Sequence, residues 1–232
     1  MRMTLPLNSQ KGDMTSTRTP TERLSALPTA AVSDALDAQG LPGSLAGIGR
    51  VTGSTLTGTA FTVRYEPVAG DDGTVGDFLD NVPRGSAVVI DNAGRLDCTV
   101  WGGIMSRVAA ARGIAGTVIN GVCRDVTASQ EVGYSLWAAG RFMRTGKDRV
   151  RCVAVQTPVV IDDVTINPGD YVHADADGVV VVPAPHIDAT LDLAEHIERI
   201  ENVIVETTIA GTPLAEARRR FGYHTLQTRS AG

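Results

Sequence analysis

The chain has 232 residues, of which 43% are hydrophobic and 20% charged, so it is long enough to bury a full core. Its formal net charge of −5 argues against a protein that holds nucleic acid through a basic face. It has neither a run of about 18 apolar residues, as a membrane-spanning helix needs, nor a secretory signal at its start. We therefore expect a cytoplasmic protein that binds neither nucleic acid nor a membrane.

The start of the chain differs in composition from the rest. Residues 1–20 are polar and rich in Thr, Ser and Pro, which predicts a flexible leader. Residues 21–232 are interpreted as a single domain with a C-terminal helical extension. The three cysteines lack CxxC spacing, so neither a disulfide framework nor a zinc site is predicted.

The first elements read clearly from their periodicity. Helical spacing predicts a helix over Ala30–Ala38, closed by Gly40 and Pro42. Alternation predicts a strand over Thr57–Tyr65, and the compact apolar run Ser86–Ile90 predicts a strand buried on both faces.

The middle of the chain predicts a βαβ unit. The Ala-rich segment Gly103–Arg112 has helical spacing and ends at Gly113, and Gly116–Ile119 is a second buried strand. Strand, glycine-rich turn, helix and strand thus follow in order, which implies parallel strands and an α/β fold.

The remaining elements are a short helix, three strands and two helices. They are expected at residues 126–132 (helix), at 152–161, 170–173 and 178–182 (strands), and at Ile187–Thr208 and Leu214–Phe221 (a long amphipathic helix and a basic helix).

Ligand sites in parallel sheets lie at the carboxyl ends of strands, and the βαβ unit has two such ends. The first leads to Gly102 and Gly103 at a helix start, where free backbone N–H groups can hold a carboxylate or phosphate. Glycines before a helix also serve close packing, so this pattern alone is weak.

The second strand end carries Arg124 and Asp125. An arginine fork suits a carboxylate, and an aspartate offers hard oxygen to a divalent cation. The same pair can also be an ordinary ion pair or a helix N-cap. Because the two strand ends lie side by side, together they favour a site for a small metal-chelating 2-oxo acid.

Other polar groups are better explained by structure. Asp175 and Asp177 resemble a cation loop but, with Gly178, favour a tight turn. The four histidines lack metal-ligand spacing, and Cys123 is expected to be a small buried residue. The glutamates of the long helix favour a solvated face.

Three segments resemble a known family. WGGIMSRVAAARGIAGTVINGVCRDV, with VSDALDAQG before it and GDYVHADADGVVVVP after it, is similar to the RraA-like family. That family includes regulators of ribonuclease activity and the divalent-metal-dependent 4-hydroxy-4-methyl-2-oxoglutarate/4-carboxy-4-hydroxy-2-oxoadipate aldolases. The resemblance extends from about Leu24 to Tyr223.

The resemblance implies an αββα sandwich and a ring-shaped homotrimer, or a homohexamer of two trimers, with active sites between subunits. It implies that Asp125 is the protein ligand of Mg²⁺ or Mn²⁺ and that Arg124 contacts the pyruvyl group. It assigns the substrate carboxylate to backbone amides of the turn formed by Gly102, Gly103, Ile104 and Met105. It also implies that a glutamate of an adjacent subunit's C-terminal helix, Glu201 or else Glu198, reaches the metal's water shell.

Two departures from the family pattern concern proton transfer. Gly103 stands where many of the aldolases have an acid, 21 residues before the arginine, and Asn120 stands where aspartate is common. Proton transfer would then fall to metal-bound water, Glu201 or another side chain such as Asp97.

The leading functional prediction is a metal-dependent lyase that cleaves a C–C bond of a 2-oxo acid through a pyruvate enolate. It would act as an aldolase or as an oxaloacetate decarboxylase. The alternative is a non-enzymatic regulator that binds an RNA-processing enzyme.

Overall fold

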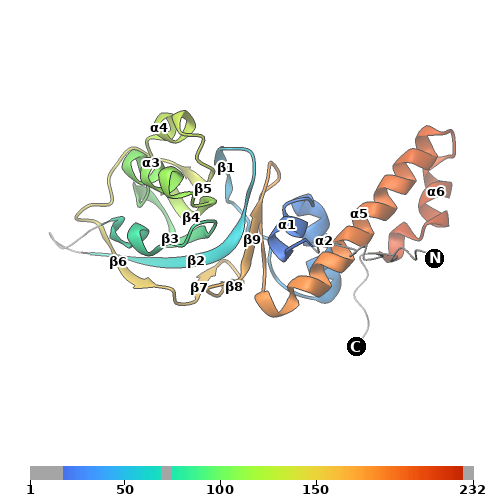
Figure 1. Cartoon of the computed structure of the whole chain (residues 1–232), viewed down its shortest axis with the longest axis horizontal. Coiled ribbons are helices and arrows are strands. Elements are labelled where there is room, and N and C mark those ends of the chain that lie inside the picture. Colours follow the sequence, from blue (N-terminus) through green and yellow to red (C-terminus); the bar gives the residue numbers. More distant parts are fainter. Residues whose placement is uncertain (1–17, 69–74, 227–232) are drawn as a thin grey trace, which may run out of the picture.

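The computed structural model describes residues 18–68 and 75–226 (Figure 1). One sheet contains β1 (Gly49–Thr52), β2 (Leu56–Pro67), β3 (Ala87–Thr99), β4 (Gly116–Cys123), β5 (Leu136–Arg141), β6 (Val150–Val155), β9 (Tyr171–Ala174) and β10 (Val179–Val182), while β7 (Val159–Ile161) and β8 (Val164–Ile166) form a separate pair. The α-helices are α1 (Pro20–Leu24), α2 (Thr29–Gln39), α3 (Gly103–Arg112), α4 (Val126–Glu131), α5 (Ile187–Ile209) and α6 (Leu214–Arg220). Short 3₁₀ turns are η1 (Asp77–Asn81), η2 (Ala184–His186) and η3 (Tyr223–Thr225).

The sheet curls toward a barrel. Its strand order is β1-β5-β4-β3-β2-β9-β10, with β6 also paired to β2. Residues 43–45, just before β1, pair with the opposite edge: the Val181 N–H donates to Gly43 O at 2.8 Å, and the Leu45 N–H donates to Val179 O at 3.0 Å. The segment leading into one edge strand therefore covers the other edge.

The predicted α/β class and its βαβ unit are confirmed. Strands β2, β3, β4 and β5 are parallel neighbours, with α3 connecting β3 to β4 and α4 connecting β4 to β5. The first part of β3 is buried on both faces, because Val88 and Ile90 join the core on one side while Val89 joins the core on the other.

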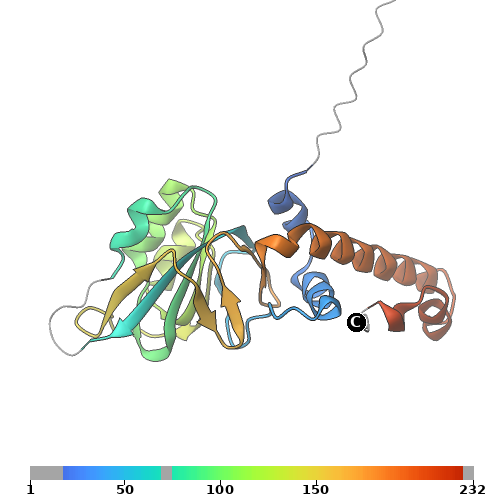
Figure 2. The same cartoon turned by 90° about the horizontal axis from the view of Figure 1, so that it is seen from below.

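Two groups of helices flank the sheet. Helices α3 and α4 lie on one side, and α1, α2 and α5 lie at the other end, beyond β9 and β10 (Figures 1 and 2). Val180 and Val182 of β10 join Leu36 and Leu191 in the core under the second group. Arg23 fastens α1 to α5 through Glu195 at 2.8 Å and Asp192 at 2.6 Å.

Two strand predictions need correction. The strand predicted to stop at Ile90 continues to Thr99 through a bend at Ala93 and Gly94, whose φ angles are 52° and 65°. The single strand predicted over residues 152–161 is two strands, because Gln156, with φ 56°, interrupts it. Strands β1, β5 and β8 were not predicted at all.

The interpretation of Asp175 and Asp177 as a turn is confirmed. The Asp175 carboxylate accepts hydrogen bonds from the Thr29 N–H at 2.9 Å, the Thr29 hydroxyl at 2.7 Å and the Asp177 N–H at 2.9 Å. It therefore satisfies the first turn of α2.

Most of the predicted leader lies outside the described residues, which begin with Arg18. The capped turn at Thr19 already starts α1, close to the predicted start of the fold. Among the described helices, none has the length and apolar character needed to cross a bilayer.

Candidate functional site

The candidate site lies where β3 and β4 end side by side. One hydroxyl joins the two ends: Thr99 Oγ1 lies 2.9 Å from both Trp101 O and Val122 O and accepts the Trp101 N–H at 3.1 Å. The Arg124 N–H donates to Trp101 O at 3.1 Å. These contacts fix the backbone of the two segments that were predicted to form a site.

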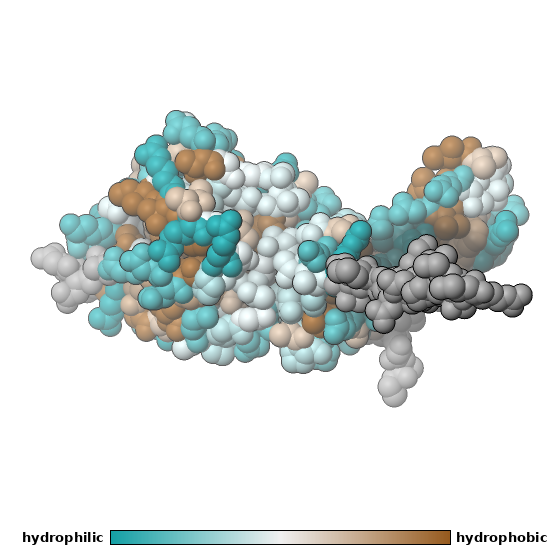
Figure 3. All heavy atoms as spheres, in the orientation of Figure 1, coloured by the Kyte–Doolittle hydropathy of each residue, from teal (hydrophilic) through white to brown (hydrophobic). Residues whose placement is uncertain are grey.

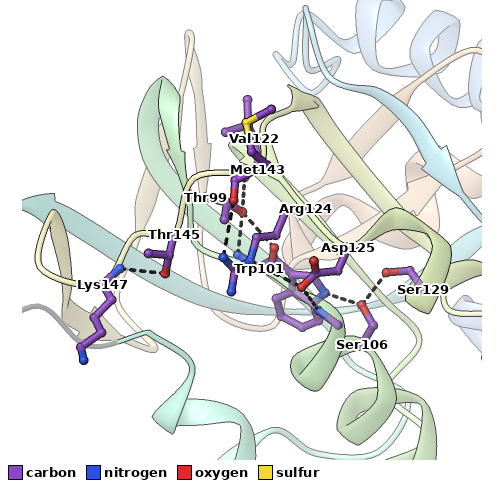
Figure 4. Close-up of polar contacts among 11 residues, drawn as sticks. Thr99, Trp101, Ser106, Val122, Arg124, Asp125, Ser129, Met143, Thr145 and Lys147 are labelled. Carbon is purple, nitrogen blue, oxygen red and sulfur yellow. Dashed lines mark hydrogen bonds and ion pairs between the residues drawn. The ribbon is translucent and has the colours of Figure 1, made fainter.

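Asp125 directs its carboxylate back across the glycine-rich turn. Its backbone is left-handed, with φ 55° and ψ 42°, a region that aspartate tolerates better than most residues. In this conformation Oδ2 accepts the Gly103 N–H at 2.9 Å (Figure 4). The side chain keeps 48% of its exposure, so the carboxylate is held on one side and open on the other.

Arg124 lies beside this carboxylate. Its Nε is 3.4 Å from Asp125 Oδ2, and its terminal nitrogen reaches Met143 O at 3.5 Å, the outer limit for a hydrogen bond. With 37% of the side chain exposed, Arg124 remains accessible to a ligand. Arg124 and Asp125 can therefore form an ion pair with each other and still bind a ligand.

A side chain at either glycine would crowd its neighbours. A Cβ at Gly102 would lie 2.9 Å from Asp125 Oδ2 and 3.2 Å from Arg124 Nε. A Cβ at Gly103 would lie 3.1 Å from the Ala128 Cβ on α4. The glycines serve both close packing and access to the first-turn amides of α3, which have no acceptor within the helix.

The predicted residues line a pocket of about 200 Å³. Its walls are Val75, Thr99, Val100, Trp101, Gly102, Gly103, Ile104, Met105, Arg124, Asp125 and Thr145. Met105 is buried in the core, whereas the Ile104 side chain is 82% exposed at the lip, and Met143 nearby is 75% exposed. Arg124 and Asp125 are the only ionisable side chains in the described lining.

A series of buried side-chain hydrogen bonds supports the base of the pocket. Trp101 Nε1 donates to Ser106 Oγ at 2.9 Å, and Ser106 Oγ lies 2.7 Å from Ser129 Oγ (Figure 4). The indole stacks on Tyr134 with ring centroids 5.7 Å apart. Because Ser106 lies on α3 and Ser129 on α4, these hydrogen bonds link the helix that begins at the glycine turn to the helix that follows Asp125.

Glu201 and Glu198 lie far from this pocket in the same chain. Both are on α5, at the opposite end of the molecule from α3 and α4 (Figure 1). Burial, together with the nearby Asp34 and Glu198 carboxylates, raises the pKa of Glu201. Either glutamate would have to come from another subunit to reach the site, as the family resemblance implied.

Asp97, the other candidate for proton transfer, and Asn120, which stands where the family commonly has aspartate, have partners of their own. Arg95 binds Asp97 at 3.0 and 2.7 Å and lowers the pKa of that carboxyl group. Asn120 donates to Asp91 Oδ1 at 3.0 Å. None of these side chains lines the pocket.

Sequence reasoning missed Thr99, Trp101 and Thr145 as site residues. Trp101 directly precedes the glycine pair, so the tight turn was an available signal for it. Thr99 and Thr145 form an isolated β-bridge between segments distant in sequence, and no local sequence pattern predicts such a contact.

Comparisons with known proteins agree with this architecture. A family model described as RraA-like, Aldolase/RraA, matches residues 29–181. The chain belongs to the RraA-like family. It is 37% identical over 200 residues to Protein DlpA of Legionella pneumophila, covering 84% of this chain but only 32% of that relative.

The other relatives include one with an enzyme name, one uncharacterized protein and one from an inhibitor family. A Halalkalibacterium halodurans protein, 31% identical with 73% and 79% coverage of this chain and of the relative, is named "Putative 4-hydroxy-4-methyl-2-oxoglutarate aldolase". An uncharacterized Pseudomonas syringae protein has TM-score 0.80 and 43% identity, with 86% and 96% coverage. Streptomyces coelicolor RraAS2, titled an unusual member of the RNase ES inhibitor RraA family, has TM-score 0.72 and 28% identity, with 78% and 94% coverage.

Among the described residues that line the pocket, Asp125 is the one that offers a carboxylate to a metal ion. No group of three or more Asp, Glu, His or Cys side chains in the described ranges could hold one. Mg²⁺ commonly retains several waters and binds through one or two carboxylates, so Asp125 with its open side fits such an ion. The remaining ligands would be water and substrate oxygens.

Proposed function

We propose that this chain is a divalent-metal-dependent lyase that cleaves a C–C bond of a 2-oxo acid through a pyruvate enolate. The observation that carries the proposal is the convergence of Arg124, Asp125 and the first-turn amides of α3 on one pocket. Asp125 would hold Mg²⁺ or Mn²⁺. When bound, the ion supplies Lewis-acid polarisation of the 2-oxo group.

The chain's own groups divide the remaining work. The α3 amides at Ile104 and Met105 would bind the substrate carboxylate, since helix N-termini favour anions. The exposed side of the Arg124 guanidinium would stabilise the oxygen that gains negative charge. Because Gly103 already donates to Asp125, it orients the metal-binding carboxylate and leaves the other oxygen free.

Decarboxylation of oxaloacetate suits this pocket better than retro-aldol cleavage. In decarboxylation the bond between C3 and C4 breaks, CO₂ leaves, and the electron pair forms the enolate of pyruvate; C3 then takes a proton from water. Retro-aldol cleavage also needs a base to remove a hydroxyl proton. Asp125 is the only carboxylate in the described lining that could act as this base. Position 103, where many of the aldolases have an acid, is a glycine here, and a Cβ at that position would lie 3.1 Å from the Ala128 Cβ.

An assembled ring would supply what one chain lacks. We include in the proposal a homotrimer or homohexamer in which Glu201, or Glu198, of a neighbouring copy completes the site. Two features support this: both glutamates are remote from their own pocket, and large apolar side chains are exposed around its lip. A cytoplasmic location is part of the same proposal.

The test measures decarboxylation of oxaloacetate with Mg²⁺ or Mn²⁺, with and without chelator. A protein-free reaction at the same metal concentration is subtracted, since the ion alone decomposes oxaloacetate. We expect chelator and Asp125→Ala each to lower turnover at least 100-fold, while the matched variant of an exposed aspartate, Asp163→Ala, keeps it. Metal-independent turnover, or turnover unchanged in Asp125→Ala, would sink the mechanism.

The second candidate is a regulator that binds an RNA-processing enzyme. The absence of further ionisable groups from the described lining favours it, as does the inhibitor family named for the Streptomyces coelicolor relative. Absence of turnover on oxaloacetate and on 4-hydroxy-2-oxo acids would support this reading.

A further inference from the structure

Two buried serines join the helices that begin at the candidate site. Ser106 lies in the first turn of α3, and Ser129 lies in the first turn of α4. Their hydroxyl oxygens are 2.7 Å apart, and both side chains are fully buried (Figure 4). Neither serine lines the pocket, so the function proposed above gives them no contact with a ligand.

Backbone hydrogen bonds connect each serine to the residue that caps its helix. The Ser106 N–H donates to Gly102 O at 3.1 Å, and the Ser129 N–H donates to Asp125 O at 3.3 Å. At the pocket, the Gly103 N–H donates to Asp125 Oδ2 at 2.9 Å. The two helix starts are therefore joined twice, at the pocket by Gly103 and Asp125, and one helical turn deeper by the two serines.

The hydroxyl pair constrains the helices more firmly than their contact at the surface, where both helices carry hydrophilic and hydrophobic side chains (Figure 3). The surface contact is the ion pair of Arg107 and Glu131 at 3.2 Å, whose side chains are 60% and 59% exposed. Water screens such a pair, and its long side chains can stay in contact while the helices shift. A buried hydroxyl pair has no water to replace a lost partner, so it holds the helices at one separation.

We propose that Ser106 and Ser129 are positioning residues, whose hydrogen bond sets the separation between the first-turn amides of α3 and the Asp125 carboxylate. This inference rests on the proposed function, in which the amides bind the substrate carboxylate and Asp125 binds the ion. A 2-oxo acid that chelates the ion has to reach both groups at once, so the spacing of the helix starts decides how well it fits. A change in this spacing weakens substrate binding without removing a metal ligand.

The first experiment examines the metal-free protein. Ser129→Ala removes one hydroxyl of the pair and leaves Ser106 with its hydrogen bond from the Trp101 indole. Because the helix starts are then joined only at the pocket, the Gly103–Asp125 hydrogen bond should open more often. We expect hydrogen exchange of the Gly103 amide, followed by NMR, to become at least 10-fold faster.

Thr117→Val is the matched control for this variant. It breaks another buried hydroxyl pair, Thr117 and Tyr134 at 2.8 Å, which joins β4 to the segment after α4 and not α3 to α4. It should lower Tm as Ser129→Ala does, yet keep Gly103 exchange within 2-fold of the wild type. Equal acceleration in the two variants, or unchanged exchange in Ser129→Ala, overturns the proposal.

The second experiment measures binding of oxalate, a small chelating dianion, to protein loaded with Mn²⁺, by titration calorimetry. Ser129→Ala should raise the Kd of oxalate at least 10-fold and keep the Kd of Mn²⁺ alone within 2-fold, while Thr117→Val keeps both. A loss of stability alone would not separate the two constants. Wild-type oxalate affinity in Ser129→Ala overturns the positioning role and leaves the proposed function standing. A wild-type protein that binds neither Mn²⁺ nor oxalate overturns both.

Discussion

Gly102 is the residue at which the site has least room. A methyl group there would meet Asp125 Oδ2 at 2.9 Å and Arg124 Nε at 3.2 Å. Both side chains are partly exposed and can move aside, so Gly102→Ala should displace the two binding groups and change the free energy of unfolding by less than about 1 kcal/mol. We expect kcat/KM for oxaloacetate to fall at least 10-fold, measured beside thermal unfolding.

Gly178→Ala is the control for this prediction, because a Cβ at Gly178 would meet no atom within 4 Å. It should keep both activity and stability. A Gly102→Ala protein with full activity would mean that the Arg124–Asp125 arrangement is not the one that binds substrate.

The residues of the candidate site differ in how far the sequence predicts them. Arg124, Asp125 and the two glycines each follow a strand closely, and adjacent parallel strands bring such positions together. Ile104, at the opening of the pocket, was predicted to act through its backbone amide, and the exposure of its side chain could not be predicted from the sequence. Glu201 shows the limit, because helical periodicity gives its face of α5, whereas its role at another copy's pocket was only implied by the family resemblance and stays a prediction.

At the scale of the elements, one buried histidine links the connection between α1 and α2 to the sheet through hydrogen bonds. His173 on β9 is 1% exposed; its Nδ1 lies 2.8 Å from the Thr57 hydroxyl on β2, and its Nε2 lies 2.9 Å from Leu27 O in that connection. Burial lowers the pKa of His173, partly offset by the Leu27 carbonyl and the Asp175 carboxylate. The ring is therefore held neutral.

This lowered pKa predicts a pH dependence of stability. Below the unfolded-state pKa of about 6.5, the unfolded chain binds a proton that the folded chain resists, so the free energy of unfolding falls as pH drops. The His173 contribution is complete above that value and is lost by up to about 1.4 kcal/mol per pH unit below it. Denaturant unfolding of wild type and His173→Gln between pH 5 and 7.5 should show a weaker slope in the variant. The exposed-site control, His196→Gln, should keep the wild-type slope.

The elements themselves were predictable where one rule dominates. The Ala-rich helix α3 and the apolar run opening β3 have strong local patterns, and both are confirmed. The continuation of β3 past Ile90 was missed, because Asp91, Asn92 and Gly94 are turn formers in isolation. Pairing of Arg95 and Thr99 with β4 overrides that preference. Such pairing is a property of the assembled sheet.

At the scale of the whole molecule, the residues that match the family model are followed by two C-terminal helices. The matched residues 29–181 contain the sheet and the pocket, while α5 and α6 lie beyond them. The amphipathic pattern predicted α5 as a helix, but a periodicity cannot show how much of the helix the rest of the fold covers.

Ligand binding should stabilise the whole chain if Asp125 holds an ion that also binds substrate. Oxalate resembles the enolate of pyruvate in charge and shape, so Mn²⁺ and oxalate together should bind the folded state alone. At about 100 times Kd this contributes about 2.7 kcal/mol, or roughly 5–10 °C in Tm for a chain of this size. Scanning calorimetry should show the shift with both ligands, a smaller one with either alone, and none in Asp125→Ala. An equal shift in that variant would place the ion elsewhere, even if the variant's activity were lost.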